Sequence, residues 1–184
     1  MIIRQAKASE ATQIAELINL AMLEITYQFI GKEDRNEANN FIAKFVAHEN
    51  NQYSYQNIYV LEIDGRILGH LSIYDGASLK QLRQPILDYI LHTYAIDYSP
   101  ADETQAGEMY IDTFAVHPSM QGKGYGEKML QFAIDKFNRI ESKTVGLLVD
   151  NDNPNAKRLY ERLGFKTIKE VEIFGKKMEH MQYA

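Results

Sequence analysis

The sequence contains no cysteine, few prolines and no long apolar run. Without cysteine the chain can form no disulfide, no thiolate metal site and no cysteine nucleophile. A membrane-spanning helix needs about 20 apolar residues in a row, and no stretch approaches this length. Residues 1–5 also lack the apolar core of a signal peptide. We therefore expect a cytoplasmic protein with no membrane association.

The composition that remains is that of an ordinary folded domain. Hydrophobic residues make up 45% of the 184 residues, close to the average for soluble globular proteins. This length suits one well-buried domain, so residues 1–184 are expected to form a single domain. The formal net charge of −5 argues against a nucleic-acid partner, because such proteins usually present a basic face.

The first part of the chain predicts a strand and two helices. Residues 2–5 read as a short strand, and Ser9 is a suitable N-cap for a helix whose apolar residues recur at helical spacing as far as Ile25. A second amphipathic helix is expected from about Asp34 to His48. Between them, residues 27–31 are predicted to form a compact aromatic loop, which is either a core plug or one wall of a substrate pocket.

A hairpin and an insertion come next. Asp64-Gly65 separates two β-prone segments, residues 57–63 and 66–74, and this pair is a strong hairpin signal. Residues 75–107 break the pattern. We expect a short turn and then a helix from about Pro85 to Tyr94, since proline interrupts a helix or begins a new one. The insertion either covers an edge of the sheet or serves as a lid or dimer element.

Strands and helices alternate in the rest of the chain. Residues 108–116 alternate as a strand, which places Tyr110, Asp112, Phe114 and Val116 on one face. One helix is predicted to end at about Phe137, and another covers residues 153–164. Strands are predicted over residues 144–149, 165–172 and 177–183. This order of elements implies one α/β domain with a mixed sheet and helices on both faces.

A glycine-rich turn stands between that strand and the helix that follows. Gly122, Gly124 and Gly126 alternate here, and such a turn leaves several backbone N–H groups at the positive end of the helix dipole, which is a site for phosphate. The P-loop pattern fails, because Gly122-Lys123 is followed by glycine and not by serine or threonine. The dinucleotide pattern fails as well, because Glu127 stands in place of its third glycine.

Two motifs remain, in a fixed order along the chain. The first is Gln121-x-x-Gly124-x-Gly126, and the second is Asn153-x-x-Ala156-x-x-Leu159-Tyr160, closed by Gly164-Phe165. At this point the chain resembles the GNAT superfamily of acetyl-CoA-dependent N-acetyltransferases. The resemblance covers the whole chain in element order and is specific over residues 111–165.

The resemblance implies a GNAT-like α/β fold. Its sheet would be mixed, mainly antiparallel and of six to seven strands flanked by helices, with a helical insertion before the cofactor-binding strand. Acetyl-CoA would be the co-substrate, and its pyrophosphate would lie on the N–H groups of residues 122–126.

Further cofactor contacts follow from the same resemblance. The strand end would pair with the pantetheine arm, and the Val116 N–H would polarise the thioester carbonyl. Asn153 would bind the arm where two strands splay apart, and Lys123 is either a charge partner of the phosphates or a solvated lysine. The implied cofactor-binding residues are Phe114, Ala115, Val116, Gln121, Gly122, Lys123, Gly124, Tyr125, Gly126, Asn153 and Tyr160.

The resemblance also implies catalytic residues. Tyr160 matches the general acid of the family, since a phenol with a pKa near ~10 can protonate a leaving thiolate whose conjugate acid has a pKa near ~8.5. Read from the residues alone, Tyr160 is a packed aromatic on a helix. The general base is Glu108 or Asp112, acting directly or through water. Leu148 stands where relatives that acetylate protein N-termini often carry glutamate, which disfavours a peptide substrate.

The expected function is acetyl transfer to a small amine or amino acid, by direct attack and without a covalent enzyme intermediate. An aromatic wall suited to a cationic amine is expected from Tyr27, Tyr53, Tyr55 and Tyr74. The alternative is a CoA-binding sensor or assembly protein that keeps the fold without the catalysis. The histidines show no metal-binding spacing, so no metal is expected. The insertion and the C-terminal strands could build a homodimer.

Overall fold

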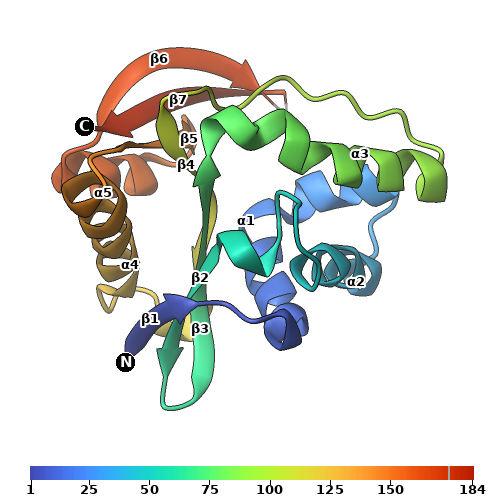
Figure 1. The fold of residues 1–184 in the computed structure, drawn as a ribbon, viewed down its shortest axis with the longest axis horizontal. Coiled ribbons are helices and arrows are strands. Elements are labelled where there is room, and N and C mark those ends of the chain that lie inside the picture. Colours follow the sequence, from blue (N-terminus) through green and yellow to red (C-terminus); the bar gives the residue numbers. More distant parts are fainter. Residues whose placement is uncertain (174) are drawn as a thin grey trace.

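The computed structural model describes residues 1–173 and 175–184, and these form one seven-stranded sheet (Figure 1). The strands lie in the order β1-β2-β3-β4-β5-β7-β6. Within the described residues, β4 and β5 are parallel and the other neighbours are antiparallel. The bounds are Ile2–Gln5 (β1), Ile58–Ile63 (β2), Arg66–Asp75 (β3), Glu108–Val116 (β4), Thr144–Asp150 (β5), Lys166–Ile173 (β6) and Lys176–Tyr183 (β7). The predicted mixed, mainly antiparallel sheet of six to seven strands is confirmed.

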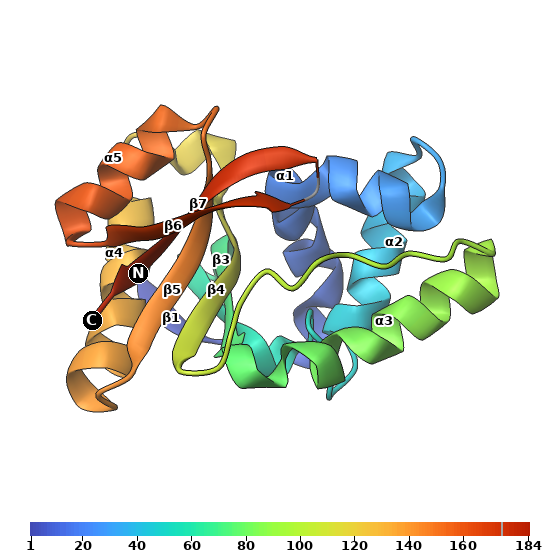
Figure 2. The same ribbon diagram turned by 90° about the horizontal axis from the view of Figure 1, so that it is seen from above.

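Helices cover both faces of this sheet (Figure 2). One face carries α1 (Ala11–Ile30), α2 (Arg35–Val46) and α3 (Leu79–Tyr94), and the other carries α4 (Tyr125–Ala133) and α5 (Pro154–Leu163). Each face has its own apolar core. Ile14, Ile42 and Ile90 are fully buried on the first face, and Leu130 and Ile134 on the second.

The turns follow the sequence signals. Asp64 and Gly65 both have left-handed backbone conformations, with φ of 51° and 76°, as a two-residue hairpin turn of type I′ requires. The predicted hairpin is therefore confirmed. Gly164, with φ of 102°, ends α5 at the predicted position.

The start and the end of α1 differ from the prediction. Ser9 is not the N-cap of this helix but lies in a 3₁₀ turn, Ala8–Glu10, which Glu10 stabilises by accepting a hydrogen bond from the Lys7 N–H (2.8 Å). Residues 27–30 form the last turn of α1 and not a loop, and Gly31 ends the helix with φ of 70°. The helix continues through Tyr27 and Phe29 and ends at Gly31, because glycine adopts the left-handed conformation easily.

Two other helices are longer than predicted. Helix α3 begins at Leu79, before Pro85 and not at it. Pro85 has no N–H to donate to the Gln81 carbonyl, four residues earlier. In the same turn, the Leu82 carbonyl accepts a hydrogen bond from the Gln52 N–H (2.9 Å). A π-helical segment, Ile134–Ile140, extends α4 beyond its predicted end. Residues 95–107 connect α3 to β4.

Candidate active site

Strand β4 changes the direction of its side chains at Asp112. Its pairing register with β3 shifts between Ser72 and Ile73, which leaves Asp112 as the extra residue of a β-bulge. Tyr110 therefore packs towards α3, whereas Phe114 packs in the core beneath α4. The predicted single face for alternate residues of this strand is wrong, because the extra residue reverses the alternation.

The bulge lies where β4 and β5 part. The described pairing of these strands covers residues 108–111 of β4 and 144–147 of β5. On the other side of β4, the His117 N–H donates to the Leu68 carbonyl of β3 (2.9 Å). Because successive N–H groups of a strand point to opposite sides, the Val116 N–H points to the side from which β5 has diverged. An extended ligand arm could pair with the strand there.

The glycine turn borders open space at the start of α4. Gly122 and Gly124 have left-handed backbones, with φ of 73° and 76°, and a Cβ on either would meet no atom within 4 Å. The first helical hydrogen bond runs from the Lys128 N–H to the Gly124 carbonyl (3.2 Å). The preceding N–H groups, those of residues 125–127, have no helical partner and lie at the positive end of the helix dipole. This geometry suits an anion.

The other predicted cofactor residues surround this turn. The Lys123 ammonium donates to the Ser119 carbonyl (2.9 Å) and is exposed. Gly126 lies against Phe114, since a Cβ there would be 3.3 Å from the ring. Around the turn, Gln121, Gly122, Lys123 and Gly124 are exposed, and Phe114, Ala115, Val116, Tyr125 and Gly126 are half-buried.

Helix α5 presents one face to a cavity. Asn153 caps the helix, because its Oδ1 accepts a hydrogen bond from the Ala156 N–H (3.1 Å). Asn153, Ala156 and Tyr160 recur at helical spacing and all line the cavity. Burial raises the pKa of Tyr160 to about 12, so its phenol keeps its proton at neutral pH. The structure thus brings two of the predicted site residues to one wall.

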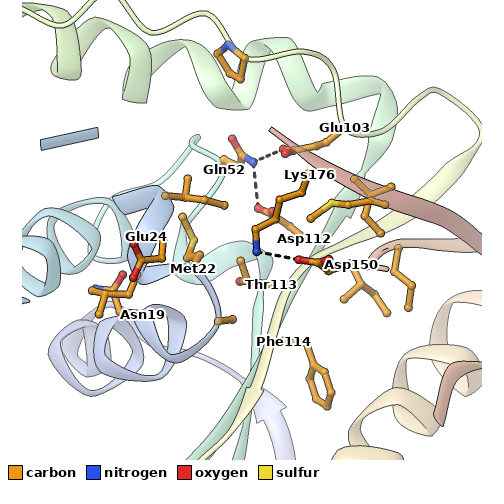
Figure 3. A pocket seen from close by; sticks show the side chains of 18 of the residues that line it. Asn19, Met22, Glu24, Gln52, Glu103, Asp112, Thr113, Phe114, Asp150 and Lys176 are labelled. Atoms are coloured by element: carbon orange, nitrogen blue, oxygen red, sulfur yellow. Dashed lines mark hydrogen bonds and ion pairs between the residues drawn. The ribbon is translucent and has the colours of Figure 1, made fainter. Parts of the chain in front are cut away.

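The cavity itself has a volume of about 820 Å³ (Figure 3). Its walls come from α1, α3, the 95–107 segment, β4, β5, α5 and β7. Apolar side chains make up much of the lining, among them Met22, Phe29, Ile86, Leu148 and Met178. This volume suits a small molecule.

A polar cluster stands on one side of the cavity. The Gln52 amide nitrogen donates to Glu103 Oε1 (2.7 Å) and to Asp112 Oδ2 (3.1 Å), and it lies 3.2 Å from the Tyr74 hydroxyl. The guanidinium of Arg83 is buried beside Glu103, with Nη2 3.3 Å from Oε1. Figure 3 shows Gln52 between the two carboxylates. Two acidic side chains from distant segments are thereby held together.

Burial sets the electrostatics of these two carboxyl groups. It raises the pKa of Asp112 well above its usual value, and the negative charge of Glu103 adds to this effect, while Gln52 and Arg83 oppose it. Burial also raises the pKa of Glu103, against the opposing effect of Arg83. Both groups hold protons more strongly than exposed carboxyl groups do.

Glu108, the other predicted base, lies away from the cavity. Its carboxylate accepts hydrogen bonds from Thr104 Oγ1 (2.6 Å) and Gln182 Nε2 (2.7 Å), and it lies 2.8 Å from His180 Nε2. Burial alone would raise the pKa of Glu108, but the hydrogen bonds from His180, Thr104 and Gln182 outweigh it and lower this pKa. A Cβ on Gly146 would lie 2.0 Å from this carboxylate. Glu108 therefore connects the 95–107 segment to β7.

Helix α1 changes course where it borders the cavity. Met22 has non-helical backbone angles, with φ of −133° and ψ of 24°. Hydrogen bonds hold the bend: Thr26 Oγ1 donates to Asn19 Oδ1 (2.8 Å), and Asn19 Nδ2 donates to Asn39 Oδ1 of α2 (2.8 Å). The bend turns Asn19, Met22 and Glu24 towards the cavity (Figure 3).

An ion pair lies on the wall of the cavity that β5 and β7 form. The Lys176 ammonium lies 2.8 Å from Asp150 Oδ2, and both side chains line the cavity (Figure 3). The hydrogen bond from Lys176 lowers the pKa of Asp150. A primary ammonium group is therefore accommodated beside a carboxylate on this wall.

Sequence reasoning missed several of these residues. Gln52 and Glu103 lie in irregular segments with no motif around them, and no sequence signal marks them as partners of Asp112. Of the four tyrosines expected on the acceptor wall, Tyr53 lines the cavity and Tyr74 approaches Gln52. In the structure, Tyr27 belongs to a helix turn and Tyr55 to a 3₁₀ turn away from the cavity lining.

Two features are absent from the described residues. Across residues 1–173 and 175–184, no three histidine or acidic side chains gather in a way that could hold a metal ion. In the same part of the chain, every helix is too short or too polar to cross a membrane.

A sheet that opens between two parallel strands, with a glycine turn beside the opening, defines the architecture of an acetyltransferase domain. Residues 18–165 match the model of the acetyltransferase (GNAT) family, and the chain belongs to this family. A solved structure described as an acetyltransferase superposes with a TM-score of 0.82 at 28% identity, covering 99% of this chain and 98% of that one.

Curated relatives differ in how much they align. The chain is 32% identical to the spermine/spermidine N(1)-acetyltransferase of Bacillus subtilis over 42% of its own length and 51% of that protein, and so spans about half the length of that relative. It is 28% identical to an L-amino acid N-acyltransferase of Escherichia coli, over 96% of this chain and 86% of that protein. The named relatives thus act on different amines.

Proposed function

We propose that this protein is an N-acetyltransferase that moves the acetyl group of acetyl-CoA to a primary amine of a small molecule. The observation that carries this proposal is the continuity of one cavity. Its lining includes Asn153 and Tyr160, which the resemblance assigns to the cofactor, together with the acidic residues Asp112 and Glu103. An amine bound there reaches the thioester without leaving the cavity.

The cofactor side is assigned from backbone geometry. The N–H groups of residues 122–127 would hold the CoA pyrophosphate, and the glycines let the main chain approach the phosphates closely. Residues 114–116 would pair with the pantetheine amides, which leaves the Val116 N–H to donate to the thioester oxygen. Asn153 would contact the same arm at the start of α5.

Tyr160 is proposed as the general acid. Its raised pKa of about 12 keeps it protonated across the neutral range, so it is available to donate its proton to the leaving sulfur. A thiolate whose conjugate acid has a pKa near ~8.5 accepts a proton from a phenol at close range.

Asp112 is proposed as the general base, and Glu108 as a positioning residue. Asp112 lines the cavity and has a raised pKa, which suits a group that must take a proton from an alkylammonium. Glu108 has a lowered pKa and is occupied by three hydrogen-bond partners.

The test is amine-dependent release of CoA from acetyl-CoA. The acceptor panel should contain spermidine, L-amino acids and simple alkylamines, with CoA affinity measured in parallel by calorimetry. We expect turnover with at least one small primary amine and none with N-terminal peptides. Tight CoA binding without turnover on any amine contradicts the proposal and favours a CoA-binding sensor.

A further inference from the structure

Two carboxyl groups in the cavity share one hydrogen-bond donor. The Gln52 amide nitrogen lies 3.1 Å from Asp112 Oδ2 and 2.7 Å from Glu103 Oε1. A primary amide has two N–H hydrogens, so each carboxyl group can receive one of them. Asp112 comes from the bulge of β4 and Glu103 from the 95–107 segment, and Gln52 is fixed by its own N–H bond to Leu82 of α3. The pair is built from three separate segments.

The positive charge near this pair is unevenly placed. Arg83, whose side chain is 8% exposed, lies between Glu103 and Asp102, at 3.3 Å and 3.4 Å. Within the described part of the chain, Asp112 has no cationic side chain within 4 Å. Other titratable and charged groups face the pair from the elements around it: Tyr53, Tyr74, Tyr98, Tyr110, Asp150 and Lys176. Of the two carboxyl groups, only Glu103 therefore has a cationic side chain from the described residues in direct contact.

We propose that Asp112 and Glu103, joined by Gln52, act as one carboxyl pair that shares a proton: Asp112 takes it from the acceptor ammonium, and Glu103 is the positioning residue that makes Asp112 basic enough to do so. Two desolvated carboxylates that accept hydrogen bonds from one amide group resist ionising together. The inference rests on the proposed acetyl transfer and assigns its proton acceptor.

The acceptor enters as an ammonium ion, which loses one proton to Asp112 Oδ2. The neutral amine then forms a bond to the acyl carbon as the carbon–sulfur bond breaks, and the sulfur takes the Tyr160 proton. The amide nitrogen loses its second proton to the Tyr160 oxygen, through water, which restores the phenol. The carboxyl pair finally releases its proton to solvent, so one proton leaves for each acetyl group transferred.

The first test is the pH dependence of kcat/KM with an active amine, which reports groups in the free enzyme. Glu103→Gln keeps the shape of the side chain and removes its charge, so the pKa of Asp112 falls. We expect the acid limb to move to lower pH by about one unit, the size typical of coupled carboxyl groups. Asp102→Asn is the control, since Asp102 contacts Arg83 and not Gln52, and it should leave the limb in place.

A second variant predicts the opposite shift. Gln52→Met removes the donor that stabilises the ionised pair, so the pKa of Asp112 rises and the acid limb moves to higher pH. Gln52→Met therefore tests the carboxyl pair even if Glu103→Gln does not fold. The proposal is overturned if a folded Glu103→Gln or Gln52→Met enzyme keeps its CoA affinity and has its acid limb at the same pH as the wild type.

A direct titration separates this inference from the proposed function. Carbon-13 NMR of the aspartate carboxyl groups follows Asp112 without any turnover. We expect its midpoint to be lower in Glu103→Gln than in the wild type. A wild type that shows this coupling and transfers no acetyl group contradicts the proposed function alone, and an enzyme that transfers acetyl without the coupling contradicts the carboxyl pair alone.

Discussion

At the scale of single residues, Tyr160 is half-buried between the apolar core beneath α5 and the cavity. Its ring packs against Phe165, with centroids 6.0 Å apart, and its side chain lines the cavity. Tyr160→Phe keeps the packing and removes the acid. We expect kcat to fall by about 100-fold, the size typical of one general acid, with CoA affinity unchanged.

The control for this variant is Tyr183→Phe. Tyr183 also packs against Phe165, with centroids 5.8 Å apart, and lies outside the cavity lining, so the kcat of this variant should match the wild type. A Tyr160→Phe enzyme with normal kcat would remove Tyr160 from the mechanism.

Sequence reasoning found the residues that stand in local motifs and missed those that meet only in three dimensions. Asn153, Tyr160 and the glycines owe their positions to a cap, a helical repeat and a turn, which are properties of neighbouring residues. Gln52 and Glu103 approach Asp112 because the irregular segments that carry them pack against β4. No periodic pattern in the sequence predicts such a contact.

At the scale of elements, the glycine turn before α4 can be tested with a matched backbone control. Gly124→Val places a side chain in a left-handed position, which costs about 1–2 kcal/mol of stability, and adds bulk where the pyrophosphate would lie. We expect CoA affinity to fall at least about tenfold, or about 1.4 kcal/mol, in calorimetric titration.

Gly65→Val separates the two effects of that substitution. Gly65 has the same φ of 76° and no atom near its missing Cβ, but it lies in the β2–β3 hairpin. It should lose similar stability and keep its CoA affinity. Equal CoA affinities in both variants would contradict the pyrophosphate assignment.

The cap of α5 is a second prediction at this scale. Asn153→Ala removes the acceptor for the Ala156 N–H and should cost about 1 kcal/mol in the free energy of unfolding, measured in urea. Asn155→Ala changes an exposed residue inside the same helix and should cost little, because alanine favours helix. Equal losses would show that the cap contributes nothing specific.

Strand β4 shows why element boundaries were easier to predict than side-chain directions. Its bounds, residues 108–116, match the prediction, since apolar and polar residues alternate over this range. The bulge at Asp112 leaves no mark in that alternation, because the extra residue is created by the register with β3. The insertion shows the same limit: its helix was expected, but its start was not, because the residues from Leu79 onward are already helical before Pro85.

At the scale of the whole molecule, Asp112 couples stability to pH. Its folded-state pKa lies well above the value near ~3.9 of an unfolded chain. Between those two values the folded protein holds a proton that the unfolded chain has released, so stability falls as pH rises. Asp112→Asn removes this dependence, and its free energy of unfolding should decline less than that of the wild type between about pH 5 and about pH 8.

Urea unfolding at several pH values measures this difference. Asp102→Asn, a half-exposed carboxylate beside the same arginine, is the control and should follow the wild type. Parallel curves for Asp112→Asn and the wild type would show that Asp112 is not held in its protonated form by the fold.

The contacts of Glu108 also set an order of assembly. This carboxylate holds Thr104, the neighbour of Glu103, and it does so together with His180 and Gln182 of β7. During synthesis on the ribosome, the α1, α2 and α3 layer can collapse long before β7 emerges. The segment that carries Glu103 gains its last anchors only when β7 enters the sheet between β5 and β6. A nascent chain would therefore complete its acid-lined wall only after β7 has been made.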